Sequence, residues 1–221
     1  MRYPRVNTGN FYQEIDRNFK KYKIPKTNPT VEKYCVPKSE KLQIPQQFLA
    51  ADMNPTSPDR GLLVYHGIGS GKTCAAISMS LAFKKVLVVL PASLIGGFRS
   101  ELRSPCAGTR YISEANRKRL AKLDPNSVEY RGIIAESDLK IDEDYVIWSY
   151  NKFAKLMDTL DLNNMLMIID EVHNMISDTG TYYSKLYELV SKAPDSFRLV
   201  IMTATPIFDK PSEIALTLNL L

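Results

Sequence analysis

The stretch His66-Gly67-Ile68-Gly69-Ser70-Gly71-Lys72-Thr73 decides the fold of this 221-residue chain. It follows the apolar run Leu62–Tyr65, which is typical of a buried strand. A glycine-rich corner between a strand and a helix directs backbone N–H groups at a phosphate chain, because side chains would block the close approach. Lys72 can then reach the β- and γ-phosphates, and the Thr73 hydroxyl can bind Mg²⁺. The sequence therefore predicts a phosphate-binding loop formed by Gly67, Ile68, Gly69, Ser70, Gly71, Lys72 and Thr73.

One position departs from the usual form of this loop. The common pattern has a glycine six residues before the lysine, and His66 stands there instead. The rest of the pattern, Gly69-x-Gly71-Lys72-Thr73, is intact. A glycine-rich loop without a nucleotide is the alternative, and a second motif further along the chain argues against it.

That second motif is the apolar run Met165–Ile169 followed by Asp170-Glu171-Val172-His173. An unbroken apolar run is typical of a parallel strand that is covered on both faces. Asp170 at its tip suits Mg²⁺, which prefers hard oxygen ligands. Glu171 is then the candidate to orient or deprotonate the water that attacks the γ-phosphate. The alternative is a strand that ends in a solvated acidic turn.

A third element is the run Arg198–Met202 followed by Thr203-Ala204-Thr205-Pro206. Its two threonine hydroxyls are expected to hydrogen-bond the Asp170–His173 segment from a neighbouring strand. A nucleotide kinase has no need of this element, whereas motor ATPases carry it. A threonine-rich strand end without a role is the alternative.

These three motifs, in this order, resemble the first RecA-like lobe of the superfamily 2 helicases and translocases, over about residues 42–221. The resemblance implies ATP and Mg²⁺ as cofactors, and it implies that His173 couples the γ-phosphate region to Thr203 and Thr205. It also implies that Gln47, with Gln46 as the fallback, reads the adenine base. Weak nucleic-acid contacts are implied for Pro91, Ser93, Ser149 and Tyr150.

A narrower resemblance is to the ATPases of nucleocytoplasmic large DNA viruses, such as the poxvirus early-transcription-factor ATPase subunit and nucleoside triphosphate phosphohydrolase I. It rests on Asp170–Asn174, on Phe98–Gly108 and on the amino-terminal stretch Phe11–Ile24. It implies a viral, transcription-associated protein of the host cytoplasm that is packaged in the virion.

Composition and charge indicate where the protein works. Residues 1–60 carry a net charge of +5 and residues 61–221 a net charge of zero, so the basic excess is an amino-terminal property that suits a nucleic acid backbone or a solvated face.

The three cysteines, Cys35, Cys74 and Cys106, show no metal-ligand spacing, and we expect reduced thiols in an intracellular, soluble protein. No apolar run approaches the roughly 20 residues of a membrane span.

Alternating strands and helices predict an α/β fold with a mainly parallel sheet and helices on both faces. Residues 1–41 form a basic arm with a helix from Asn10, its plausible N-cap, to Tyr22 and a proline-containing connector. Residues 42–221 form the RecA-like domain, with strands near 61–66, 86–90, 145–149, 165–170 and 198–203. Helices are expected at 72–83, 94–103, 151–160, 181–192 and 211–220. Within the less regular segment 107–144, we expect a basic helix at 113–123 and a short strand at Ser127–Tyr130.

The functional prediction is the ATP-binding lobe of a nucleic-acid-dependent ATPase that works on DNA or RNA. The arginine finger of such enzymes comes from a second RecA-like lobe, which this chain does not contain, so we expect the 221 residues alone to hydrolyse ATP poorly. An ATP-switched transcription-factor scaffold, which binds transcription machinery without translocating, is the alternative. A different P-loop enzyme, such as a nucleotide kinase, is the second alternative.

Overall fold

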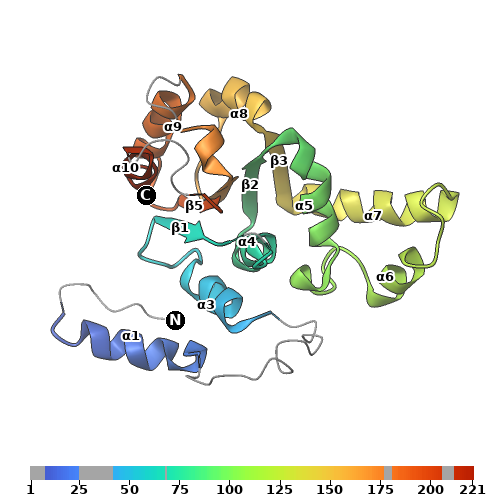
Figure 1. Ribbon diagram of the computed structural model, residues 1–221, viewed down its shortest axis with the longest axis horizontal. Helices are drawn as coiled ribbons and strands as arrows, with labels where there is room; N and C mark the ends of the chain where they lie inside the picture. The colour runs from blue at the N-terminus through green and yellow to red at the C-terminus, as the bar shows by residue number, and fades with distance from the viewer. Residues whose placement is uncertain (1–7, 25–41, 68, 177–180, 206–211) are drawn as a thin grey trace.

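The computed structural model describes residues 8–24, 42–67, 69–176, 181–205 and 212–221. Its centre is a five-stranded, wholly parallel sheet within this described part of the chain, with the strand order β1-β5-β4-β2-β3 (Figure 1). The strands are β1 (Gly61–Tyr65), β2 (Lys85–Leu90), β3 (Tyr145–Ser149), β4 (Met165–Asp170) and β5 (Arg198–Thr203). All five lie where the sequence predicts them, and the predicted α/β, RecA-like class is confirmed.

Apolar side chains cover both faces of the sheet, which explains the unbroken apolar strands. Successive residues point to opposite faces, so Val88 belongs to one buried cluster and Leu87 to the other. Helices α4 (Lys72–Ser80) and α5 (Ile95–Leu102) pack on the first face. The second face carries α8 (Tyr150–Leu156), α9 (Thr181–Ser191) and α10 (Ser212–Leu218). Because all five strands run the same way, the ends of β1, β4 and β5 meet at one edge, the carboxyl edge.

The amino-terminal arm contacts the lobe through aromatic rings. Helix α1 (Phe11–Phe19) and a short 3-10 turn lead to Tyr22. The rings of Phe19 and Tyr22 lie 5.3 and 6.1 Å from that of Phe48 in α3 (Ile44–Asp52). Asn10 precedes α1 as predicted, but its amide donates to Glu14 and does not cap a backbone N–H group. The predicted connector lies outside the described residues.

The segment after α5 differs from the prediction. The predicted helix is present as α6 (Glu114–Leu120), but the short strand predicted at Ser127–Tyr130 is wrong, because α7 (Val128–Asp144) begins there. The Ser127 hydroxyl accepts a hydrogen bond from the Tyr130 N–H group, which is the capping arrangement of a helix start. The apolar and aromatic residues of this short stretch are therefore a weaker indication of a strand than the capping serine is of a helix.

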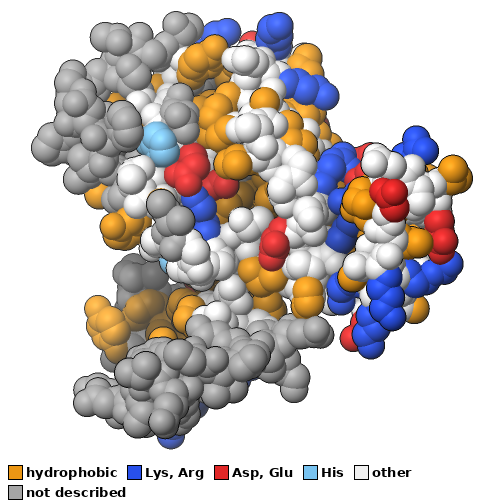
Figure 2. Space-filling view, turned by 45° about the vertical axis from the view of Figure 1, so that its right-hand side comes forward, with side chains coloured by type: hydrophobic (Ala, Val, Ile, Leu, Met, Phe, Trp, Pro, Cys, Tyr) orange, Lys and Arg blue, Asp and Glu red, His pale blue; other side chains and the backbone are white. Residues whose placement is uncertain are grey.

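Ion pairs hold α7 against α5 and the loop that follows it. The acidic side chains of α7 lie beside arginines, with Arg99 Nη1 at 2.9 Å from Asp138 Oδ1 and Arg110 Nε at 2.9 Å from Asp144 Oδ2. Arg103 also pairs with Asp138. Figure 2 shows these opposite charges interspersed at the right of the molecule. The acidic side chains Asp138 and Asp144 of α7 are therefore paired within the protein.

No helix in the described ranges has the length and apolar character that crossing a membrane requires.

Candidate nucleotide-binding site

The glycine-rich loop turns sharply at the carboxyl edge of the sheet. Gly69 and Gly71 have φ angles of 77° and 81°, in the left-handed region that residues other than glycine rarely adopt. Ser70 closes the turn, because its N–H and its hydroxyl donate to the Gly67 carbonyl at 3.2 and 2.6 Å. Helix α4 begins at Lys72, directly after Gly71. Ile68 lies outside the described residues.

Lys72 forms an ion-pair cluster with Asp170 and Glu171. Its Nζ lies 2.9 Å from Asp170 Oδ1 and also contacts Glu171 Oε1. Burial lowers the pKa of Lys72, but the hydrogen bonds and charges of the two carboxylates outweigh it and raise the pKa above its usual value. Burial raises the pKa of Glu171, but Lys72, the Ala204 N–H group and His173 together outweigh it and leave that pKa below its usual value. For Asp170, burial prevails over Lys72 and the pKa is raised.

Asp170 has an oxygen that suits a metal ion. Its Oδ1 is buried and lies 2.9 Å from Lys72 Nζ, the cation that compensates its charge here. A buried carboxylate oxygen without a hydrogen bond is costly unless a cation compensates it. Thr73, at the start of α4, lines the same cavity as Lys72. These hard oxygens, a hydroxyl and a carboxylate, fit Mg²⁺.

A cavity of about 380 Å³ lies over the loop and its charged cluster. Figure 2 shows acidic, basic and histidine side chains gathered beside a hollow on this face. Three of the lining residues were not predicted from the sequence: Cys74, Glu101 and Ala204. The signal for Ala204 was its place in the Thr-Ala-Thr-Pro turn, whereas nothing near Glu101 pointed to the nucleotide. The cavity is lined by Gly67, Gly69, Gly71, Lys72, Thr73, Cys74, Glu101, Glu171 and Ala204.

His173 lies against both threonines of the third motif. Its Nδ1 is 3.4 Å from the Thr203 hydroxyl, 3.3 Å from the Thr205 hydroxyl and 3.5 Å from Glu171 Oε2. Glu171 Oε2 in turn accepts from the Thr203 hydroxyl and the Ala204 N–H group, each at 3.4 Å. The structure thus brings together the ends of β4 and β5. Pro206 lies outside the described residues.

The two adjacent glutamines face different surroundings. Gln46 is buried, and its amide nitrogen donates to the Gly71 carbonyl at 3.3 Å. A Cβ atom at Gly71 would come within 2.7 Å of that nitrogen, which gives a second reason for glycine there. Gln47 is exposed, and its amide donates to the Leu42 carbonyl at 2.7 Å. The structure therefore places the fallback residue, Gln46, against the phosphate loop and Gln47 away from it.

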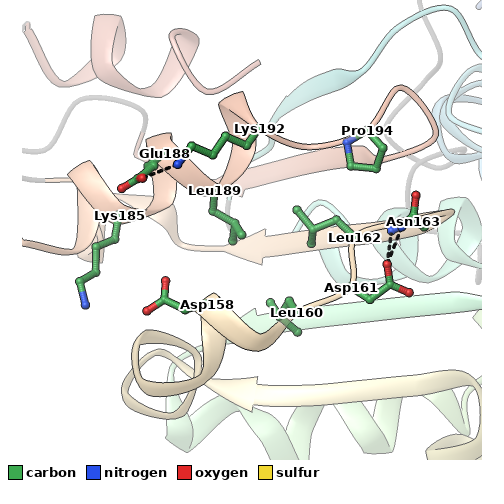
Figure 3. A pocket seen from close by; sticks show the side chains of 10 residues that line it. All are labelled: Asp158, Leu160, Asp161, Leu162, Asn163, Lys185, Glu188, Leu189, Lys192 and Pro194. Atoms are coloured by element: carbon green, nitrogen blue, oxygen red, sulfur yellow. Dashed lines mark hydrogen bonds and ion pairs between the residues drawn. The ribbon is translucent and has the colours of Figure 1, made fainter.

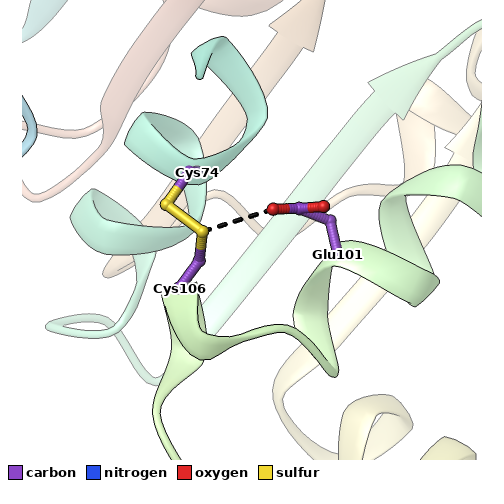
Figure 4. Close-up of side chains that lie close together, drawn as sticks. All are labelled: Cys74, Glu101 and Cys106. Atoms are coloured by element: carbon purple, nitrogen blue, oxygen red, sulfur yellow. Dashed lines mark hydrogen bonds between the residues drawn. A yellow bond between two sulfur atoms is a disulfide. The ribbon is translucent and has the colours of Figure 1, made fainter. Parts of the chain in front are cut away.

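The prediction of reduced cysteines is wrong for two of the three. Cys74, next to Thr73 in α4, forms a disulfide with Cys106 in the short 3-10 turn Pro105–Ala107 (Figure 4). Glu101 Oε1 lies 3.3 Å from the Cys106 sulfur, which has no hydrogen to donate while the disulfide is intact. The cysteines lie 32 residues apart, so their spacing could not show that α4 and this 3-10 turn bring them together. Cys35 lies outside the described residues.

The four weak nucleic-acid candidates lie at the carboxyl ends of β2 and β3. Ser93 is exposed, and Pro91 is half-buried at the end of β2. The Ser149 hydroxyl caps α8 by accepting from the Lys152 N–H group at 3.4 Å. The Tyr150 hydroxyl donates to the backbone carbonyl of Asp170 and, at 3.0 Å, to that of Glu171. Ser149 and Tyr150 therefore have partners within the protein.

A second cavity, of about 400 Å³, lies at the opposite edge of the sheet (Figure 3). Leu162 and Asn163, which line it, precede β4, whose far end carries Asp170. Lys192 pairs with Glu188 at 2.6 Å on its rim, and Asp161 accepts hydrogen bonds from the Asn163 backbone and side chain and from Lys85. This cavity is remote from the motifs, and three of its charged side chains, Asp161, Glu188 and Lys192, are exposed and paired.

The loop, the carboxylate pair at the tip of β4 and the parallel sheet define a P-loop nucleoside triphosphatase lobe of the RecA-like type. Residues 38–208 match the family described as "Type III restriction enzyme, res subunit", and the chain belongs to this family. It spans about two fifths of the length of the first curated relative described next.

Several relatives are viral proteins. The chain is 56% identical, over 99% of its own length and 39% of the relative's, to a "Putative ATP-dependent RNA helicase" of Acanthamoeba polyphaga mimivirus. A "Termination factor NPH-I homolog" of African swine fever virus is 25% identical over 73% of this chain and 22% of its own. The fold is similar to that of the "Sulfolobus solfataricus SWI2/SNF2 ATPase core in complex with dsDNA", with a TM-score of 0.50, 18% identity and coverage of 73% of this chain and 31% of that one. The predicted resemblance to superfamily 2 and to viral ATPases is confirmed.

Proposed function

We propose that this chain is the ATP-binding lobe of a nucleic-acid-dependent ATPase of the helicase or translocase type. The observation that carries the proposal is the ion-pair cluster of Lys72, Asp170 and Glu171, because Lys72 and Glu171 line a cavity of about 380 Å³. An ammonium group, a candidate metal ligand and a candidate base at one site are the parts that phosphoryl transfer requires. The viral relatives add a role in transcription to the proposal.

Each residue has a role in this proposal. The loop N–H groups and Lys72 bind the phosphates, and Lys72 leaves its carboxylate partners to do so. Thr73 and Asp170 would hold Mg²⁺, whose charge would neutralise the phosphate oxygens. Glu171, as a carboxylate, orients the attacking water and accepts its proton. The exposed Gln47 stays our candidate for the base-reading amide, because both ends of the buried Gln46 amide are bonded to the backbone of Gln43 and Gly71.

A second RecA-like lobe is also part of the proposal, because the described residues place no arginine at the cavity. An arginine finger contributes about 10³–10⁵ to the rate of the nucleoside triphosphatases in which it has been measured. We therefore expect slow hydrolysis by residues 1–221 alone and faster hydrolysis when a second lobe is supplied.

The test is the rate of Mg²⁺-dependent ATP hydrolysis by the full-length protein, without nucleic acid and with single-stranded or duplex RNA or DNA. We expect stimulation by at least one of these, and the preferred one identifies the substrate class. Glu171→Gln is the matched inactive control. Nucleotide binding with no stimulation by any nucleic acid would contradict the proposal and favour the ATP-switched scaffold.

A further inference from the structure

One hydroxyl group contacts both peptide groups that flank Glu171. Tyr150 opens α8 directly after the edge strand β3, and β2 separates β3 from β4 in the sheet. Its hydroxyl nevertheless reaches the end of β4, where it donates to the carbonyl oxygens of Asp170 and Glu171. The Tyr150 ring packs against the buried cluster that contains Val89 and Ile169. A contact with nucleic acid would account for neither hydrogen bond.

The conformation of Glu171 is one that needs support. Its φ and ψ angles are 53° and 51°, in the left-handed region that residues with a side chain enter at a cost in free energy. Such residues persist where the surrounding structure holds them, and they cluster at functional sites. Only one other non-glycine residue of the described ranges, Asn164, has a positive φ.

The two carbonyl groups are the ones that define this conformation. The angle φ of Glu171 sets the orientation of the peptide group that carries the Asp170 oxygen, and ψ sets that of the group carrying the Glu171 oxygen. A single hydroxyl, whose one proton is shared between both oxygens in a three-centre hydrogen bond, therefore restrains φ and ψ together. A change at Tyr150 therefore alters the restraint on the Glu171 backbone and leaves the Glu171 side chain chemically unchanged.

The left-handed turn also directs the Glu171 carboxylate. From this backbone, Oε1 reaches Lys72 and Oε2 reaches the Thr203 hydroxyl and the Ala204 N–H group. A rotation of the two peptide groups would carry the carboxylate out of this arrangement. The position of a catalytic base matters because small displacements cost rate steeply.

We infer that Tyr150 is a positioning residue: its hydroxyl holds the backbone of Glu171 in the left-handed conformation that points the carboxylate into the nucleotide cavity. This rests on the proposed role of Glu171 in hydrolysis. Tyr150 then acts in the hydrolytic step, whereas the resemblance to superfamily 2 implied a weak contact with nucleic acid.

The test is Tyr150→Phe in the full-length protein, which removes the hydroxyl and keeps the ring in the core. We expect kcat to fall about ten-fold, the effect of about one hydrogen bond, while the KM for ATP and the affinity for a nonhydrolysable ATP analogue stay unchanged. Tyr183→Phe is the matched control, because the Tyr183 hydroxyl also donates to a backbone carbonyl, that of Leu216 at 3.1 Å, away from the cavity. This control should retain the wild-type kcat.

A second variant separates positioning from general structural support. If Tyr150 acts through the Glu171 carboxylate, Tyr150→Phe should cause no further loss in a Glu171→Gln background, since groups that act as a unit are not additive. An unchanged kcat in Tyr150→Phe, or the same ten-fold loss in both backgrounds, overturns the inference and leaves the proposed function standing. A wild-type protein that does not hydrolyse ATP overturns both.

Discussion

The two edges of the sheet hold their charged side chains in opposite ways. At the carboxyl edge, the Lys72, Asp170 and Glu171 side chains are only 15%, 9% and 22% exposed, and they share one cluster. At the amino edge, Lys85 pairs with Asp161 at 2.7 Å with side chains 51% and 60% exposed. A buried charge must be compensated by its neighbours, whereas an exposed pair is compensated by water. Both edges carry a cavity of similar volume, but only the carboxyl edge holds a buried cluster of charges in the described part of the chain. This difference distinguishes the edge that is suited to catalysis.

The largest expected effect is that of Glu171→Gln at the carboxyl edge. The change keeps the shape of the side chain but removes the base, so we expect kcat for ATP hydrolysis to fall by about 10²–10⁴ while nucleotide binding persists. Hydrolysis assays together with calorimetric binding of a nonhydrolysable ATP analogue measure both. Glu188→Gln, the same substitution in an exposed ion pair at the amino edge, is the control. Equal losses in both variants would end the distinction between the edges.

Lys72→Ala should impair binding as well as hydrolysis. The change removes a phosphate ligand and leaves two carboxylates without their cation, and one charge-assisted contact contributes about 1.5–3 kcal/mol. We expect the affinity for Mg²⁺-ATP to fall at least about ten-fold, as measured by calorimetry. The matched control is Lys185→Ala, which removes the same side chain from the rim of the other cavity. Unchanged nucleotide affinity in Lys72→Ala would contradict the assignment of the site.

The disulfide is a further difference between the two edges, because it ties helix α4, which begins at the carboxyl edge, to the turn Pro105–Ala107. Closing a chain segment of 32 residues restrains the unfolded chain, which corresponds to about 3–4 kcal/mol. We therefore expect Cys106→Ser to lower the free energy of unfolding by about that amount in urea titrations. Cys35→Ser, which keeps the disulfide, is the control. Identical titrations of the wild type with and without a reductant would show that the bond contributes nothing.

The carboxyl edge could be predicted from the sequence because each of its motifs is local. Lys72 and Thr73 follow the glycine loop directly, and Asp170-Glu171 follows an apolar strand whose place in a parallel sheet is fixed by its pattern. The strand positions and the approach of His173 to the two threonines were predictable for the same reason.

What could not be predicted depends on contacts between distant segments. Cys74 meets Cys106, and Tyr150 meets Asp170, only after helices pack on the sheet. The choice between Gln46 and Gln47 depends on which face of α3 turns toward the loop, and one residue of register decides it. In the segment 107–144, long-range ion pairs and a capping serine determine the structure, and neither has a periodic signature.

His173→Ala tests the link between the ends of β4 and β5. Its Nδ1 lies within 3.3–3.5 Å of three oxygens, so the variant loses contacts to Thr203, Thr205 and Glu171 together. If these contacts couple nucleic acid to hydrolysis, the stimulated rate should fall about five-fold, the effect of about 1 kcal/mol, while the unstimulated rate is retained. The measurement is the ratio of the two ATPase rates. An unchanged ratio would remove the coupling role from His173.

The smallest effect is expected for Lys85→Ala at the amino edge. The hydrogen bonds to Lys85 and Asn163 hold the pKa of Asp161 at about 2, below its usual value. A lowered pKa in the folded state means that the ion pair contributes to stability above the unfolded pKa of 3.8 and that this contribution is lost as the pH falls toward 2. Because the pair is exposed, the variant should unfold at nearly the wild-type temperature at pH 7 and hydrolyse ATP at the wild-type rate. A difference in thermal unfolding between variant and wild type should be largest at neutral pH and vanish near pH 2. A loss of ATPase activity in Lys85→Ala would mean that the amino edge also takes part in the reaction. The difference between the two edges would then not hold.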